Sequence, residues 1–216
     1  MSQISKALAQ FTQRYVALHA QHQQPLSYFC GRAEQQSPCI IGEVEHGCAQ
    51  WQAVPRAVAN NVDFESLSQA LELALPIDYE DFFRFQYAPP MAFRSDFGQG
   101  ELLQCWDDED FHMLKENLIG HVFMKRQLNL PPTFFIGVMD DETRVLSMKP
   151  HQPELYLEIL GQSDLIQVAL SLHEFLEQLE PRLTSSQTVE LNTAPQSSTE
   201  LSWWDNMKIW LYNKTR

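Results

Sequence analysis

Carboxylates are the most concentrated chemical groups in this sequence, and many of them fall in one stretch. Residues 63–110 hold twelve Asp and Glu against two bases, Arg84 and Arg94, in a chain of 216 residues with a net charge of −13. Grouped carboxylates repel nucleic acid and anionic lipid headgroups, and they attract Lys- and Arg-rich surfaces. Charge alone leaves two interpretations open: an acidic surface that keeps the protein soluble, or a face that recognises a cationic partner.

Acid–base catalysis is a second chemistry that abundant carboxylates allow. A glycosidase-like pair needs two carboxyl groups about 5–10 Å apart across a cleft, and the sequence singles out no such pair. It also contains no G-x-S-x-G, no phosphate-binding glycine loop and no H-E-x-x-H. His121 follows Glu116 by five residues, so the two do not share a helical stripe. We therefore assign no catalytic residue and treat an enzyme as the minor hypothesis.

Cys39, His46 and Cys48 form the nearest grouping to a metal site. Their spacing matches no familiar zinc pattern. Cys39 lies in an apolar run, which is typical of a buried thiol. We therefore predict no metal ion and no cofactor.

The sequence shows no signal for export or membrane insertion. Residues 1–10 are polar and mixed, unlike a signal peptide. No apolar run approaches the roughly 18 residues of a spanning helix. The four cysteines include no C-x-x-C pair. We expect a protein that is made and kept in the cytoplasm with free thiols.

Helices are predicted where apolar residues recur at helical spacing. Residues 2–19 form one such segment, and a second begins near Asp63 and ends at Pro76. The longest helix is expected to open at Asp107–Asp110 and to run to about Leu128. Acidic residues belong in a first helical turn, where they face unpaired N–H groups. Part of the acidic cluster therefore has a purely structural explanation.

Strands alternate irregularly with these helices. We predict a hairpin from residues 39–45 and 49–54, a strand over 101–106, and a second hairpin from 133–139 and 144–148. A further strand over 154–160 and a last helix over 165–179 complete the chain. This order favours an α+β fold, a mixed and largely antiparallel sheet with helices packed on it. We expect a domain over residues 1–183, a flexible polar linker over 184–200 and an aromatic-rich, helical segment over 201–216.

The stretch Glu101–Gly137 carries the most specific pattern in the chain. It contains the block Glu116-Asn117-Leu118-Ile119-Gly120-His121, and Leu130-Pro131-Pro132-Thr133 follows. With Leu102-Leu103-Gln104, Trp106 and Ser37-Pro38-Cys39-Ile40-Ile41, these pieces resemble the SecY-interacting Syd family over about residues 11–183. Leu75–Phe82 also looks like the L-P-x-D-Y-x-x-F signature of the wider SUKH superfamily, to which Syd belongs.

This resemblance implies a non-enzymatic α+β protein that is peripheral to the cytoplasmic side of the cell inner membrane, with a soluble pool in the cytoplasm. The implied partner is SecY, the channel subunit of the translocase, whose basic cytoplasmic loops would meet an acidic concave surface. Binding would regulate or quality-control translocation, and no nucleic acid or small-molecule substrate is implied. The negative charge concentrated in residues 63–110 agrees with this role. The acids we assign to partner binding are Asp78, Glu80, Asp81, Asp96, Glu101, Asp107, Asp108 and Asp110.

Two structural alternatives accompany that assignment. Asp107 and Asp108 are also suited to helix capping, and Asp78 and Glu80 to a solvated face. Within the Glu116–His121 block, Leu118, Ile119 and Gly120 are expected to pack, and His121 to complete an internal hydrogen bond. As a test, reversing Asp78, Asp81 and Asp96 is expected to weaken association with SecY more than reversing Glu174, Glu177 and Glu180.

A protein of a different class remains as the alternative function. The SUKH superfamily includes many immunity proteins that neutralise toxins, and many of these are acidic. The Glu116–His121 block and Leu130–Thr133 favour Syd over this alternative.

The final 33 residues are not explained by the resemblance, because members of the family usually end near Leu183. Residues 201–216 contain Trp203, Trp204 and Trp210 with nearby bases. Tryptophan beside cations suits a membrane–water interface. The same residues also suit a helix that docks on the domain or on a neighbouring copy, so membrane contact and docking both stay open.

Overall fold

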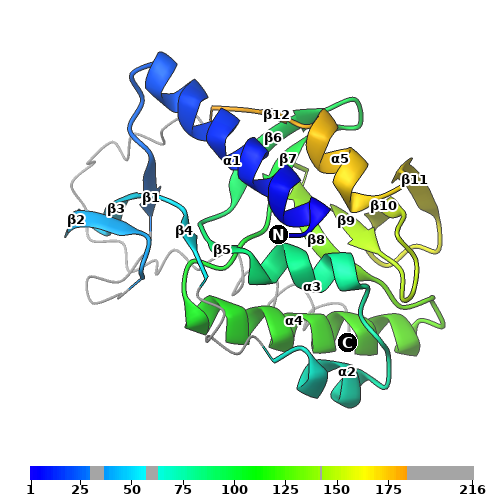
Figure 1. The fold of residues 1–216 in the computed structure, drawn as a ribbon. Coiled ribbons are helices and arrows are strands. Elements are labelled where there is room, and N and C mark those ends of the chain that lie inside the picture. The colour runs from blue at the N-terminus through cyan, green and yellow to red at the C-terminus, as the bar shows by residue number, and fades with distance from the viewer. Residues whose placement is uncertain (30–36, 57–62, 142, 184–216) are drawn as a thin grey trace, which may run out of the picture.

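The computed structural model describes residues 1–29, 37–56, 63–141 and 143–183. Its centre is a seven-stranded antiparallel sheet (Figure 1). From one edge to the other, the strands are β11 (Leu165–Ala169), β10 (Leu155–Ile159), β9 (Arg144–Met148), β8 (Phe134–Met139), β7 (Gly98–Leu102), β6 (Met91–Ser95) and β12 (Glu180–Pro181). From β6 to β11, each strand pairs with its neighbour in sequence. The strand β12 then returns to pair with β6, which brings residue 180 beside residue 94.

Two smaller sheets lie to one side of the central sheet (Figure 1). One has the order β1 (Ser27–Phe29), β3 (Cys48–Trp51) and β2 (Ile40–Glu45). The other pairs β4 (Val54–Pro55) with β5 (Gln86–Tyr87). The β2–β3 hairpin confirms the one predicted from the sequence.

Five helices are found in the described residues: α1 (Gln3–Gln21), α2 (Glu65–Leu71), α3 (Ile77–Arg84), α4 (Asp108–Gln127) and α5 (Leu172–Gln178). In α1, Ile4, Leu8, Phe11 and Tyr15 are buried at the predicted helical spacing. The helix packs against both α3 and α5. Arg14 of α1 donates to the carbonyl oxygen of Leu176 at 3.2 Å and so satisfies one of the open carbonyls at the end of α5.

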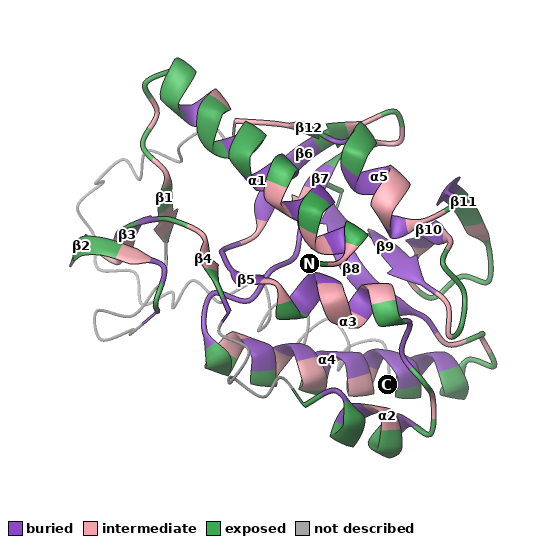
Figure 2. Ribbon diagram, in the orientation of Figure 1, coloured by how far each residue is buried: buried purple, intermediate pink, exposed green. Residues whose placement is uncertain are grey.

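The strand β8 is buried on both faces because different helices contact its neighbouring residues. The ring of Phe134 lies 5.8 Å from that of Tyr79 in α3. The ring of Phe135 lies 5.4 Å from that of His121 in α4. Successive side chains of a strand point to opposite faces, so α3 and α4 enclose this part of the sheet. Figure 2 shows the resulting buried centre, with exposed residues on the outer sides of the helices.

The α+β fold with a largely antiparallel sheet is confirmed, but two elements were predicted wrongly. Residues 165–179 do not form one helix: β11 occupies the first part, and α5 begins after Ser171. The Ser171 hydroxyl accepts from the N–H of Glu174 at 3.1 Å, a capping arrangement that starts a new helix. The helix predicted to end at Pro76 ends at Leu71, where Glu72 takes the left-handed conformation with φ 53°.

Other boundaries differ by smaller amounts. The strand predicted over 101–106 is β7, which is shifted to Gly98–Leu102. The helix predicted from Asp107–Asp110 is α4, with Asp107 as its cap. The predicted linker and aromatic segment, residues 184–200 and 201–216, lie outside the described residues, as does Cys30.

Candidate functional site

The eight carboxylates assigned to partner binding lie in three parts of the fold. Asp78, Glu80 and Asp81 are on α3. Asp107 caps α4, and Asp108 and Asp110 are in its first turn. The remaining two, Asp96 and Glu101, belong to the β6–β7 hairpin.

The α3 carboxylates lie beside the start of α5. The pKa of Asp78 is raised above its ordinary value, first because burial disfavours the charged form and second because of the Asp81 charge, while His173 of α5 acts in the opposite direction. Glu80 instead forms an ion pair with Arg84, with Oε2 and Nη1 2.7 Å apart. Asp78 is therefore the α3 acid that lies near the start of α5, with Asp81 close to it.

The three acids at the start of α4 have internal partners. The Asp107 carboxylate accepts from the N–H of Asp110 at 2.9 Å, and the Asp110 carboxylate accepts from the N–H of Trp106 at 2.9 Å. Asp108 accepts from the hydroxyl of Tyr87 at 2.6 Å. The capping alternative is thus correct for Asp107, whereas Asp108 engages a side chain.

Glu101 lies apart from both groups. Burial raises its pKa, the Arg182 charge lowers it and the Asp140 charge raises it again. Arg182 is itself paired with Asp140, with Nη2 and Oδ1 2.9 Å apart. Glu101 therefore belongs to a partly neutralised charge cluster on the sheet.

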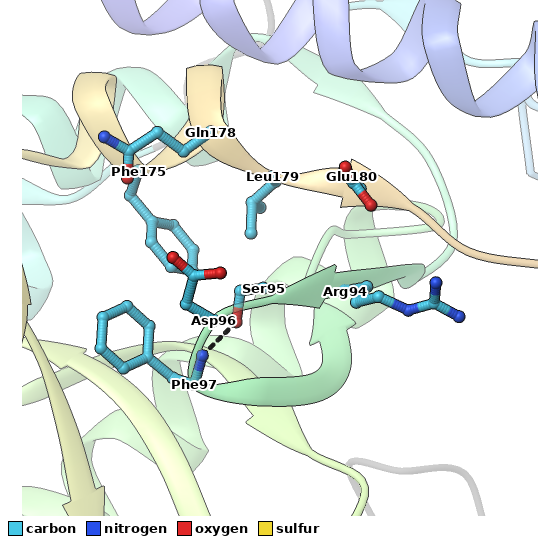
Figure 3. Close-up of a pocket in the computed structure, with 8 residues that line it drawn as sticks. All are labelled: Arg94, Ser95, Asp96, Phe97, Phe175, Gln178, Leu179 and Glu180. Carbon is cyan, nitrogen blue, oxygen red and sulfur yellow. Dashed lines mark hydrogen bonds between the residues drawn. The ribbon is translucent and has the colours of Figure 1, made fainter.

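Asp96 lines a hollow between the β6–β7 turn and α5. On the α5 side, Phe175 and Leu179 are almost completely buried, with exposed fractions of 2% and 1%. Figure 3 shows the Asp96 carboxylate directed toward α5 and the Arg94 guanidinium pointing away from the hollow. The hollow is lined by Arg94, Ser95, Asp96, Phe97, Phe175, Gln178, Leu179 and Glu180.

The helix α5 connects the hollow with the α3 carboxylates. His173 at its start lies near Asp78, and Gln178 at its end lines the hollow with Asp96. A seven-residue helix is about 10 Å long, so the two groups of acids lie at opposite ends of one short helix. We call the resulting surface the acidic face and define it as Asp78, Asp81, Asp96, Glu174, Glu177 and Glu180.

Sequence reasoning missed half of the acidic face. Glu174, Glu177 and Glu180 lie outside the acidic stretch 63–110: the first two are on α5, and the pairing of β12 with β6 places Glu180 beside Arg94. Two exposed apolar residues, Ile77 at 66% and Leu170 at 67%, adjoin Asp78 and α5 along the chain.

The sequence blocks that carried the family resemblance meet in a buried polar network rather than on this face. The ring Nε2 of His121 lies 2.9 Å from the hydroxyl oxygen of Thr133. Lys125 donates to Glu158 at 2.6 Å and to Thr133 at 3.1 Å, and Thr133 donates to Glu158 at 2.6 Å. The expected internal bond of His121 is confirmed, and Leu118 and Ile119 pack in the core.

Within the described ranges, no group of three His, Cys, Asp or Glu residues is placed to hold a metal ion. Cys39, Cys48 and Cys105 are free thiols, as expected from the sequence. None of the helices in the described part of the chain is long and apolar enough to cross a bilayer. The tryptophans assigned to membrane or docking contact, Trp203, Trp204 and Trp210, lie outside the described residues.

The fold defines an α+β protein with carboxylates grouped at both ends of α5. A family model described as Syd protein (SUKH-2) matches residues 5–181. A protein of Shewanella halifaxensis named "Protein Syd" is 35% identical over 203 residues, which covers 94% of this chain and 92% of that protein. Proteins of the same name from Shewanella pealeana and Shewanella baltica are 36% and 37% identical, covering 85% and 82% of this chain and 84% and 82% of their own lengths. The chain belongs to the Syd family.

The expectation that family members usually end near Leu183 does not hold for the S. halifaxensis protein. The match with the S. halifaxensis protein covers 94% of this chain, a share that a match ending at residue 183 of 216 could not reach. The family model itself ends at residue 181. Part of the segment after residue 183 is thus shared with that relative, although it lies outside the family model.

Proposed function

We propose that this protein is a non-enzymatic binding protein for SecY, and that its acidic face receives basic cytoplasmic loops of that channel. The observation that carries the proposal is the placement of carboxylates at both ends of α5: Asp78 and Asp81 near His173, and Asp96 beside the hollow whose floor is Phe175 and Leu179. Membership of the Syd family supports the choice of partner. The protein would act peripherally, on the cytoplasmic side of the inner membrane, to regulate or quality-control translocation.

Several of the eight assigned acids are less suited to contact a partner, because they already have partners within the protein. Asp107 and Asp110 already accept backbone hydrogen bonds, and Glu80 is paired with Arg84. Cations offered by a partner would compete with these internal partners. We therefore assign the main contacts to the acidic face, with Asp108 and Glu101 outside it.

Charge and apolar contact would contribute differently to binding. Exposed ion pairs are worth about 0–1 kcal/mol each, so the carboxylates mainly steer the encounter and fix its register. Affinity comes largely from side chains that fill desolvated pockets. The hollow at Phe97, Phe175 and Leu179 offers such a place within the acidic face.

A charge-reversal experiment tests the proposal. Asp78→Lys, Asp81→Lys and Asp96→Lys together should weaken association with SecY-containing inverted membrane vesicles by at least about tenfold, since attraction becomes repulsion. Glu174, Glu177 and Glu180 are unsuitable as the comparison, because they belong to the same face. The matched control is Glu43→Lys, Glu45→Lys and Glu65→Lys, which applies the same charge change at exposed positions on β2 and α2. Equal loss in both triple variants would rule out a localised binding face.

An immunity function is the second candidate, because the matching family carries the superfamily label SUKH-2 and the acidic face would suit a basic toxin equally well. Affinity purification of the full chain from its native cells separates the two. Recovery of translocase subunits supports SecY binding, whereas recovery of a secreted toxin supports immunity.

A further inference from the structure

The hollow beside α5 is too small for an ordinary ligand. It encloses about 160 Å³, whereas small-molecule pockets occupy about 300–1,000 Å³. Its shape and size suit a single large side chain of a polypeptide.

The chemistry of the hollow favours an aromatic side chain with an N–H group. The half-buried Phe97 provides apolar contact, the almost completely buried Phe175 and Leu179 form the base of the hollow, and Asp96 and Glu180 place carboxylates at its margin (Figure 3). Among the described residues, Asp96 has no hydrogen bond or ion pair assigned to its carboxylate. Tryptophan combines a large apolar surface with one N–H donor that requires a partner when buried. Nearby bases on the same segment would further match the acidic margin.

The chain carries such a segment near this place. Residues 201–216 contain three tryptophans together with Lys208, Lys214 and Arg216, against the single acid Asp205. The described chain ends at Leu183, shortly after Glu180, which is itself part of the hollow. A linker of the length of residues 184–200 would span about 20–25 Å (root-mean-square) if it behaved as an unstructured chain. The linker that precedes residues 201–216 therefore begins next to the hollow that we consider as their binding site.

We propose that residues 201–216 occupy the hollow of their own chain through one of Trp203, Trp204 and Trp210, and so compete with an external cationic partner. This inference rests on the proposed function in one respect only: residues 201–216 and SecY would bind to the same acidic face. A short flexible tether gives an effective concentration in the millimolar range. A segment that binds with a Kd of about 0.1 mM would then weaken the external partner by about tenfold.

Backbone amide NMR spectra of the full-length protein test the contact directly. Trp203→Ala, Trp204→Ala and Trp210→Ala together should shift the amides of Asp96, Phe97, Leu179 and Glu180, because they remove the occupant. The control variant, Asn206→Ala, Asn213→Ala and Thr215→Ala, alters three polar positions of the same segment and should shift these amides much less. In the reverse direction, Asp96→Lys with Glu180→Lys should shift the amides of residues 201–216.

Three results would overturn the inference. Unchanged amides at the hollow in the tryptophan variant would show that the segment does not reach it. Loss of the wild-type pattern on tenfold dilution would assign the occupant to a second copy. Selective broadening of the amides of residues 201–216 by vesicles of anionic phospholipid, with the hollow amides insensitive to the tryptophan variant, would assign the segment to a membrane surface.

The same variants separate this inference from the proposed function. If cis docking and SecY binding share the face, the tryptophan variant should bind SecY-containing vesicles about tenfold more tightly than the wild type. If the hollow amides shift while SecY affinity is unchanged, the cis contact stands and SecY binds elsewhere. If the hollow amides do not shift, the cis contact fails whatever the SecY affinity is.

Discussion

At the scale of single residues, the buried network around Thr133 determines how its neighbours are protonated. The Thr133 hydroxyl donates to Glu158 and accepts from Lys125, so the short contact with His121 requires Nε2–H of the imidazole to donate. Burial is the main cause that lowers the His121 pKa to about 4, with Glu158 raising it and Lys125 lowering it. His121 is therefore neutral in the folded protein at neutral pH.

This protonation state makes stability depend on pH. The unfolded chain binds a proton at His121 below about pH 6.5, whereas the folded chain does so only near pH 4. Acidification between these values therefore favours unfolding through this residue, by up to about 1.4 kcal/mol per pH unit. Urea unfolding from pH 7 to pH 5 should show a steeper loss for the wild type than for His121→Gln, whose amide replaces the Nε2–H donor. Parallel curves for the two proteins would exclude His121 as the titrating group.

The Lys125–Glu158 ion pair gives a second prediction at this scale. Both side chains are almost completely buried, and their charged atoms are 2.6 Å apart. Lys125→Met would leave the Glu158 carboxylate without its counter-charge, at a cost of about 3–5 kcal/mol in the free energy of unfolding. Lys125→Met with Glu158→Met removes both charges and should recover much of that loss. Urea denaturation of the two variants would measure the difference, and a double variant no more stable than the single one would contradict this account.

At the scale of elements, the start of α4 allows the capping role of an acidic residue to be measured separately from partner binding. Asp107 accepts the N–H of Asp110, so Asp107→Ala should cost about 1 kcal/mol of stability, whereas Asp107→Asn keeps an acceptor and should cost less. Because Asp107 lies outside the acidic face, both variants should retain the affinity for SecY of the wild type. Thermal unfolding and vesicle binding measure the two effects. A large loss of SecY affinity in Asp107→Asn would return this residue to the binding site.

Some of the helices and strands could be predicted from sequence patterns, and others could not. The β8–β9 hairpin and α4 were predictable because apolar residues and caps define them locally. The division of residues 165–179 was not, because a strand such as β11 is specified by its pairing with β10. Leu165, Val168 and Leu172 have spacings that suit a helix, so their pattern was ambiguous. Ser171 with Glu174 formed the local signal for the start of α5.

At the scale of the whole molecule, charge counting alone could not say which carboxylates share a surface. Residues 63–110 supplied Asp78, Asp81 and Asp96, which lie on the acidic face. They also supplied Asp107 and Asp110, whose carboxylates accept hydrogen bonds from backbone N–H groups. The return of β12 to β6 adds Glu180 from a distant part of the sequence. A long-range strand pairing of this kind leaves no local pattern in the sequence. The residues of the acidic face could therefore be identified only from the three-dimensional structure.

The segregation of charge makes association with SecY sensitive to salt in a specific way. The screening length falls from about 10 Å at 0.1 M to about 3 Å at 1 M salt, so attraction acting across the gap between approaching surfaces is lost. The association rate should fall by at least about tenfold over this range, while the dissociation rate changes less, because apolar contact in the hollow is not screened. Stopped-flow mixing with detergent-solubilised SecY would measure both rates. The triple variant Asp78→Lys, Asp81→Lys and Asp96→Lys should lose this salt dependence, whereas the Glu43, Glu45 and Glu65 variant should retain it. A wild-type association rate that is independent of salt would refute steering by the acidic face.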